Sequence, residues 1–281
     1  MNKQEVVKLA KSFIETSADN YLKKEISIAE AVVGVKIFDD PIFAIGDAED
    51  EYFVKLKNPV AIGSHFKLPK EWLPQGRTVM SFFLPYTEAV KRGNSQERTW
   101  PAPEWLHGRY EGQMLLNKLS RYLQAQLESA GYPSVALSLD KSFWVKTDVH
   151  QDISHDCDDS FLSFTSNWSE RHVAFVCGLG TFGLSKGLIT VMGMAGRFGS
   201  IVTELELAPD KREYVEYDEY CSMCGACSRQ CPVNAISMEN GKDHQKCSDF
   251  LTVVKAKYKP RYGCGKCQVA VPCASSIPSG Q

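Results

Sequence analysis

The chain has 281 residues, which at about 150 residues per domain indicates roughly two domains. It has 32 Lys and Arg against 34 Asp and Glu, so its formal charge of -2 excludes a general electrostatic attraction to nucleic acid or membranes. A hydrophobic content of 43% with 23% charged residues excludes disordered, collagen-like and coiled-coil classes. No apolar run approaches the roughly 18 residues of a membrane span, and the first residues lack an apolar signal core. We therefore expect a soluble, cytoplasmic protein without membrane contact.

The first 210 residues indicate a mixture of helices and strands. Residues 4–16 place apolar side chains at spacings of three and four, which predicts an amphipathic helix. Residues 31–38 and 77–84 are strand-like runs, separated by segments rich in Asp, Pro and Gly. Residues 111–130 predict a second helix, which Gly131 caps, and residues 200–207 predict a strand that closes the domain near residue 209.

An acidic segment at residues 148–160 contains five Asp, two His and one Cys. These are metal-ligand types, but their spacing matches neither a calcium loop nor a helical zinc pair. We therefore interpret the segment as a solvated loop.

A glycine motif follows a short apolar run, with glycines at positions 178, 180 and 183. The pattern Gly-x-Gly-x-x-Gly is typical of a dinucleotide site when a helix follows it. Here the next segment contains four more glycines, which disfavour a helix. The motif therefore favours a loop whose backbone closely approaches another flat or anionic ligand.

Eight of the ten cysteines lie between residues 221 and 273, which predicts a metal centre. The run Cys-x-x-Cys-x-x-Cys-x-x-x-Cys-Pro is that of bacterial ferredoxins, in which the fourth cysteine ligates the other cluster. Disulfides and zinc are less favoured, because the chain lacks a secretion signal and zinc sites usually use two separated pairs. The crossed pattern predicts two [4Fe-4S] clusters. The first cysteine set comprises Cys221, Cys224, Cys227 and Cys273, and the second cysteine set comprises Cys231, Cys247, Cys264 and Cys267.

Basic residues surround the insertion between Cys247 and Cys264. They are expected to offset the negative charge of the clusters, and they could also dock an acidic electron donor or, less favourably, RNA phosphate. They are Lys255, Lys257, Lys259, Arg261 and Lys266.

Several motifs occur in the order found in epoxyqueuosine reductases, a family related to reductive dehalogenases. They are residues 174–183, residues 198–207, the cysteine run from Cys221, residues 247–252 and residues 262–268. The resemblance implies an α+β protein, with a nitroreductase-like α/β domain at residues 1–209 and a bacterial-ferredoxin-like double [4Fe-4S] domain at residues 210–281. It also implies that a base-off cobalamin borders the glycine loop. The residues expected at this cofactor are Trp168, Gly178, Leu179, Gly180, Thr181, Phe182 and Gly183.

Two departures indicate a divergent subfamily whose substrate is undefined. Phe164 stands where an ungapped count places the family's proton-donating Asp, and Val271 stands at the usual position of the last cysteine ligand. Glu170, Arg171 and His172 are therefore the candidate catalytic residues, offering a general acid and an anion clamp. The alternative for these three residues is a salt-bridged, capped turn.

Together these features predict an iron-sulfur oxidoreductase in which two clusters reduce a cobalamin that acts on a substrate. The expected partners are a low-potential donor such as ferredoxin or flavodoxin, and a small-molecule substrate or a partner corrinoid protein. A tRNA substrate is less favoured. The alternative is a non-catalytic electron carrier that serves a partner enzyme or reactivates its corrinoid.

Overall fold

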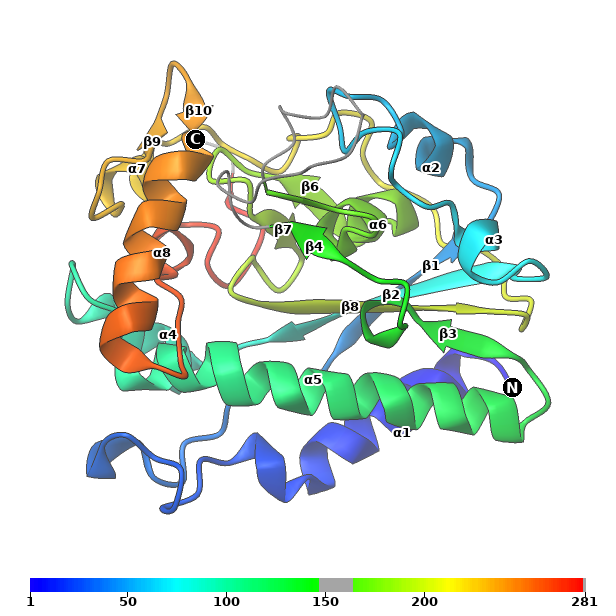
Figure 1. Cartoon of the computed structure of the whole chain (residues 1–281), viewed down its shortest axis with the longest axis horizontal. Coiled ribbons are helices and arrows are strands. Elements are labelled where there is room, and N and C mark those ends of the chain that lie inside the picture. Colours follow the sequence, from blue (N-terminus) through cyan, green and yellow to red (C-terminus); the bar gives the residue numbers. More distant parts are fainter. Residues whose placement is uncertain (147–163, 280–281) are drawn as a thin grey trace, which may run out of the picture.

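A four-stranded antiparallel sheet forms the centre of the computed structural model, which describes residues 1–146 and 164–279 (Figure 1). Every residue of the second strand is buried, because strands flank it on both sides and helices cover both faces. The strands, in spatial order, are β1 (Ile42–Asp47), β2 (Thr78–Pro85), β8 (Gly196–Thr203) and β3 (Ser134–Ala136).

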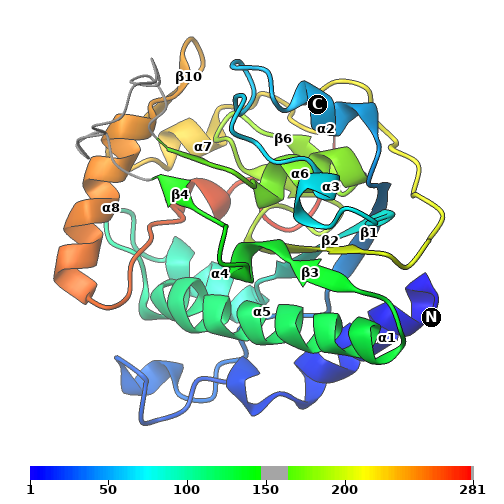
Figure 2. The same cartoon turned by 45° about the vertical axis from the view of Figure 1, so that its right-hand side comes forward.

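Helices cover the sheet on two sides, as both views show (Figures 1 and 2). α5 (Pro103–Ser129) lies on one face with α1 (Lys3–Thr16) packed against it, and α6 (Glu170–Cys177) lies on the other face. α4 (Glu88–Ser95) packs against α5. The mixed helix and sheet class and both long helices are confirmed. Gly131, with φ of 88°, follows the end of α5 as predicted.

Residues 31–38 do not form the predicted strand. They contain the end of the 3-10 helix η2 (Glu30–Val32), and the rest of the segment forms isolated bridges and hydrogen bonds with Asn20 and Leu22 but no strand. Val32, Ile37 and Phe38 are nevertheless buried, because they pack in the core beneath α5. Their β-branched and aromatic character therefore reflects burial and not strand pairing.

The connecting elements are short. β4 (Val145–Lys146) pairs with β5 (Thr165–Ser166), and β6 (Gly180–Phe182) pairs with β7 (Leu188–Thr190). The other short helices are η1 (Ala18–Asn20), α2 (Glu51–Lys55), α3 (Pro69–Trp72) and η3 (Leu137–Leu139). The acidic segment at residues 148–160 lies outside the described residues.

The cysteine-rich part packs against α4 and the start of α5, at the left of Figure 1. Arg261 forms an ion pair with Glu111 of α5 at 2.5 Å, and Lys266 donates to the backbone of Asn94 in α4 at 2.8 Å. Within the described ranges, no helix is long and apolar enough to cross a membrane. The elements of this part are α7 (Ala226–Arg229), β9 (Ile236–Ser237), β10 (Gly241–Lys242), α8 (His244–Tyr258) and η4 (Lys266–Gln268).

Candidate iron-sulfur centre and its surroundings

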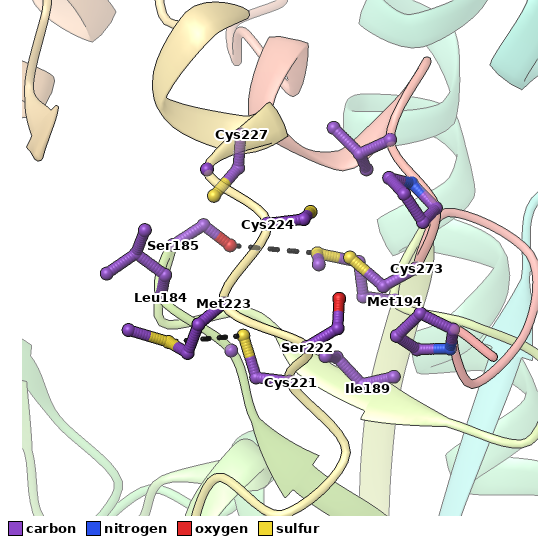
Figure 3. Close-up of a pocket in the computed structure, with 15 residues that line it drawn as sticks. Leu184, Ser185, Ile189, Met194, Cys221, Ser222, Met223, Cys224, Cys227 and Cys273 are labelled. Carbon is purple, nitrogen blue, oxygen red and sulfur yellow. Dashed lines mark hydrogen bonds between the residues drawn. The ribbon is translucent and has the colours of Figure 1, made fainter. Parts of the chain in front are cut away.

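The four cysteines of the first set line one cavity, part of which is open to solvent (Figure 3). Three of them come from the loop and helix at α7, and Cys273 comes from the segment after η4. Gly225, with φ of 68°, turns the chain between Cys224 and Cys227 in a conformation that favours glycine. The fold thus brings together thiols from two separate segments of the chain.

An apolar wall behind these thiols comes from the first 209 residues. Ile189 of β7 and Met194 are buried, and both line the cavity (Figure 3). The Met194 N–H donates to the Cys273 carbonyl at 3.0 Å. A Cβ on Gly193 would lie 2.4 Å from the backbone of Ala274, so glycine permits this close approach. The wall limits solvent access, which is one of the factors that set the potential of an iron-sulfur cluster.

Burial changes the acidity of these thiols. It raises the pKa of Cys227 to about 11 and the pKa of Cys273 to about 12, and neighbouring thiols add to both shifts. Without a cluster, the two thiols are therefore protonated at neutral pH. Because iron binds the thiolate, cluster insertion must release these protons.

The second cysteine set gathers where α8, η4 and the end of α7 meet. Cys247 lies in α8, Cys267 lies in η4, and Cys264 precedes η4. The charge on Cys267 interacts with Cys247 and Cys231, and the charge on Cys264 interacts with Cys267 and Cys247. Burial raises the pKa of Cys264 to about 12. All four cysteines of the second set are thus neighbours in space.

The two sets also adjoin each other, since the charges on Cys227 and Cys267 interact. Within residues 1–146 and 164–279, no group of three or more His, Cys, Asp or Glu side chains is arranged to hold a single metal ion. A [4Fe-4S] cluster takes one thiolate per iron, so its four cysteines surround a volume and need not converge on one point. The cavity of the first set has this arrangement, and its thiols therefore fit a cluster.

The glycine motif forms a helix end and a hairpin. Gly178 ends α6 in a left-handed conformation with φ of 99°, and β6 then pairs with β7. A Cβ on Gly180 would lie 1.9 Å from the Ile189 carbonyl oxygen, and a Cβ on Gly183 would lie 3.2 Å from the side chain of the same residue. The motif continues into a hairpin, where a dinucleotide fold would have a helix. This agrees with the prediction that the motif is not a dinucleotide site.

The residues expected at the corrinoid are largely engaged with the chain itself. Leu179 and Thr181 are buried, and the Thr181 hydroxyl accepts a hydrogen bond from the Tyr220 N–H at 2.8 Å. The glycines approach neighbouring protein atoms and no open space. The half-buried Phe182 ring lies 4.8 Å from the His172 ring. The expected glycine loop therefore does not form a cradle for a flat cofactor.

Trp168 lies in the core and not at a cofactor. It is 1% exposed and stacks between Phe53 and Phe66, with ring centroids at 6.3 and 5.5 Å. Its indole N–H donates to the Ser200 hydroxyl at 2.9 Å. The expectation that this ring packs on a macrocycle is corrected by this packing, which leaves no free face.

The three candidate catalytic residues point in different directions, because successive residues of a helix are about 100° apart. The Ser200 hydroxyl donates to Glu170 Oε2 at 2.7 Å, and buried Glu170 Oε1 has no partner within the described part of the chain. Arg171 is exposed and donates to the Lys186 carbonyl at 2.6 Å. His172 Nδ1 lies 2.7 Å from the Ser169 hydroxyl. The structure does not gather the three side chains into one group.

Burial has opposite effects on the two titratable groups of this turn. It raises the pKa of Glu170 to about 7, against an ordinary value of 4.5. Burial, together with the charges of Arg171 and Lys186, lowers the pKa of His172 to about 4. Near neutral pH the carboxyl group can therefore gain or lose a proton, whereas the imidazole is neutral.

Sequence reasoning missed the polar contacts that hold the cysteine-rich part. Arg261 donates to Glu111, which also contacts His107 at 2.9 Å, and all three side chains are largely buried. Lys266 donates to backbone oxygens of Asn94 and Glu97. Arg261 and Lys266 each lie more than 140 residues from these partners in sequence, so no local spacing could have revealed the contacts.

Comparisons with known proteins agree with the iron-sulfur assignment. Residues 214–237 match a family model described as a 4Fe-4S binding domain. A tetrachloroethene reductive dehalogenase of Desulfitobacterium hafniense is 41% identical over 68 residues, covering 24% of this chain and 12% of that protein. An epoxyqueuosine reductase of Francisella cf. novicida (strain Fx1) is 26% identical over 246 residues, covering 80% of this chain and 60% of that protein.

A solved structure shows the same fold over almost the whole chain. It is an epoxyqueuosine reductase with an epoxyqueuosine-modified tRNA-Tyr stem loop, with a TM-score of 0.52 and 18% identity. The match covers 99% of this chain and 66% of that chain. The resemblance that the motifs predicted is confirmed by these similarities, and at this identity the structural match shows the fold alone.

Proposed function

We propose that this relative of the epoxyqueuosine reductases and reductive dehalogenases is an iron-sulfur reductase that holds two [4Fe-4S] clusters. The observation that carries the proposal is the cavity in which Cys221, Cys224, Cys227 and Cys273 meet (Figure 3). The first cluster takes these four thiols, and the second takes the four mutually interacting thiols of the second cysteine set. The eight ligands lie in a ferredoxin-like module, residues 210–281, which packs against a nitroreductase-like module, residues 1–209.

The order of electron transfer follows from the surroundings of the two sets. The cavity of the first set is partly open to solvent, and the exposed Met223 lies at it. Cys247 and Cys267 of the second set interact electrostatically with Arg171 at the start of α6. We therefore assign electron entry to the first cluster and electron exit, towards α6, to the second. The donor is a low-potential protein such as ferredoxin or flavodoxin.

The acceptor implied by the resemblance is a base-off cobalamin, which would supply a strongly reducing cobalt centre. The described residues of the glycine loop do not fit it as a cradle, so we derive no step through this cofactor. Arg171 is exposed, and its charge interacts with Cys247 and Cys267 of the second cysteine set. It is the predicted residue that an anionic group can reach most freely.

All three residues at the start of α6 retain roles in the proposal. With a pKa of about 7, Glu170 holds a proton on part of the molecules at neutral pH, which suits a proton donor. Arg171 is exposed and permanently charged, which suits binding of an anionic substrate group. His172 is neutral near pH 7 because burial holds its pKa at about 4, and it serves as a hydrogen-bonding group.

The substrate is a small molecule or a corrinoid on a partner protein. A tRNA is the third candidate, because a solved relative holds a tRNA stem loop. The exposed Lys255, Lys257 and Lys259 at the end of α8 offer a positive surface for an acidic partner.

Anaerobic reconstitution tests the two-cluster proposal. We expect about eight iron and about eight sulfide per chain, and about half of each in Cys273→Ser and in Cys267→Ser. Cys177→Ala is the matched control, because this buried cysteine lies outside both sets and should leave the iron content unchanged. Retention of full iron in both ligand variants would refute the assignment of the sets.

Titration with cob(II)alamin separates the reductase from the electron carrier. A saturating shift of the cob(II)alamin absorption band to the base-off position would show that residues other than the described glycine loop hold the cofactor, and would support the reductase. A fully loaded protein that produces no shift, yet exchanges single electrons rapidly with a donor, would replace the proposal with the non-catalytic carrier.

A further inference from the structure

Lys266 occupies an unusual position for a lysine. It lies between Cys264 and Cys267 and is 2% exposed. Its ammonium group donates to the Asn94 carbonyl at 2.8 Å, to the Glu97 carbonyl at 2.5 Å and to Asn94 Oδ1 at 3.3 Å. These three acceptors are uncharged, and they fix the ammonium group in one place.

No carboxylate forms an ion pair with Lys266 among residues 1–146 and 164–279. Arg261, the other buried cation of this part, has the Glu111 carboxylate at 2.5 Å. Burying an unpaired ammonium group is strongly unfavourable, so its charge requires compensation from a nearby negative group.

Two negative groups act on this ammonium group, Cys264 of the second cysteine set and the Glu97 carboxylate, and the effect of Cys264 is the larger. Glu97 is exposed, so water and salt screen its charge. The Lys266 backbone N–H hydrogen bonds to the Cys264 sulfur, and the charge of this cysteine interacts with the ammonium group. Four thiolates around a [4Fe-4S] cluster give the site a net negative charge. The ammonium group and the cluster would therefore neutralise each other in a region from which water is largely excluded.

The other basic residues near the insertion act more weakly. Lys255, Lys257 and Lys259 are exposed, so water and salt screen their charges. Arg261 is neutralised by Glu111. Around the first set, the nearby Arg229 is also exposed. The charges of half-buried Lys242 and exposed Arg171 also act on Cys267. Lys266, at 2% exposed, is the most deeply buried of these cations.

We propose that the ammonium group of Lys266 is the fixed counter-charge of the second cluster and makes this cluster easier to reduce than the first. Reduction adds one electron, supplied by the ferredoxin- or flavodoxin-type donor, and takes the cluster from the 2+ to the 1+ core state. The added negative charge is stabilised by the ammonium group, and no proton moves. Electrons that enter at the first cluster then accumulate on the second, beside α6. This inference rests on the proposed second cluster, and Lys266 is a positioning residue because it acts through that cluster.

The test is a redox titration of the fully loaded protein, monitored by EPR. Lys266→Met removes the charge and keeps most of the side-chain volume. We expect it to lower the midpoint potential of one cluster and leave the other unchanged. A tenfold shift in the ratio of reduced to oxidised cluster corresponds to about 59 mV for one electron. Lys255→Met, which removes an exposed charge, is the control and should shift neither potential.

A second variant keeps the test decisive if Lys266→Met fails to hold the second cluster. Lys266→Gln removes the charge but keeps a hydrogen-bond donor for the carbonyl oxygens of Asn94 and Glu97. We expect the same potential to fall. Unchanged potentials in a variant with full iron, or equal shifts of both clusters, would overturn the inference. A wild-type protein with iron for only one cluster would instead refute the two-cluster proposal, and this result is read before any potential is measured.

Discussion

Replacing Glu170 by Gln should change how the stability of the protein depends on pH. In the unfolded chain this carboxyl group loses its proton near its ordinary pKa of 4.5, whereas in the folded protein burial raises the pKa to about 7. Between these values the folded state holds more protons than the unfolded state, so the free energy of unfolding falls as the pH rises. The stabilising contribution is complete below about pH 4.5 and is lost once the pH exceeds about 7.

The size of this effect follows from the difference between the two pKa values. At about 1.4 kcal/mol for each pH unit, a rise from 4.5 to about 7 corresponds to about 3 kcal/mol. Glu170→Gln removes the titration and keeps a similar shape, although its amide leaves one buried donor without a partner at the position of Oε1. That penalty is the same at every pH. Between about pH 5 and about pH 8.5, the free energy of unfolding of Glu170→Gln, taken relative to wild type, should therefore rise by about 3 kcal/mol.

Anaerobic urea denaturation of protein with matched iron content, at both pH values, measures this change. Glu88→Gln is the matched control, because Glu88 is also the first residue of its helix but is exposed. The control should show the same difference from wild type at both pH values. If Glu170→Gln behaves like the control, the carboxylate is not desolvated in the folded protein and the reasoning fails.

Two further substitutions test how the cysteine-rich part is held. Arg261→Met leaves Glu111 buried without its cation and should destabilise the protein by about 3–5 kcal/mol. Arg121 is exposed, so the control Arg121→Met should change stability by less than about 0.5 kcal/mol. Thermal melting compares the two variants. Equal melting temperatures would show that the ion pair is not formed. Gly193→Ala should lose iron from the proposed first cluster, because its Cβ would overlap the backbone that follows Cys273. The control is Gly131→Ala, which is also at positive φ but has no close neighbours and should retain all its iron. Iron analysis decides the second case, and full iron in both variants would contradict the close approach.

The parts of the fold that the sequence predicted are those with a local pattern. The 3.6-residue periodicity predicted the helices α1 and α5, because it records which face of a helix is buried. The apolar run predicted β2, because this strand is buried along its whole length. Residues 31–38 misled the prediction because burial without a partner strand selects the same residue types.

The strand β8 shows why other boundaries could not be read. It begins at Gly196, well before the predicted start, because its glycines lie under aromatic rings of β2. A Cβ on Gly196 would lie 2.5 Å from the Phe83 ring, and a Cβ on Gly199 would lie 2.6 Å from the Phe82 ring. In the sequence alone, these glycines argue against a strand. The reason that glycine is needed at these positions becomes visible only when the two strands are paired.

The same contrast holds for the candidate site. The spacing of Cys221, Cys224 and Cys227 predicted that these thiols lie together, because ligand spacing within a short loop is itself a geometric constraint, and the crossed ferredoxin pattern added Cys273. The assignment of all eight thiols to two clusters stays a prediction. The buried ammonium group of Lys266 and the carboxyl group of Glu170 were beyond such reasoning, since their environments depend on Asn94 and Ser200, which lie far from them in sequence.

The hydrogen bond between Met194 and Cys273 has a consequence for the order of assembly during synthesis. The second cysteine set is complete once residue 267 has been made, whereas the first set waits for Cys273. Cys273 is then seated against the backbone of Met194, so the hairpin before that residue must already be folded. In the proposed two-cluster protein, the second set can therefore be filled before the first set, whose completion requires that both parts of the chain have come together.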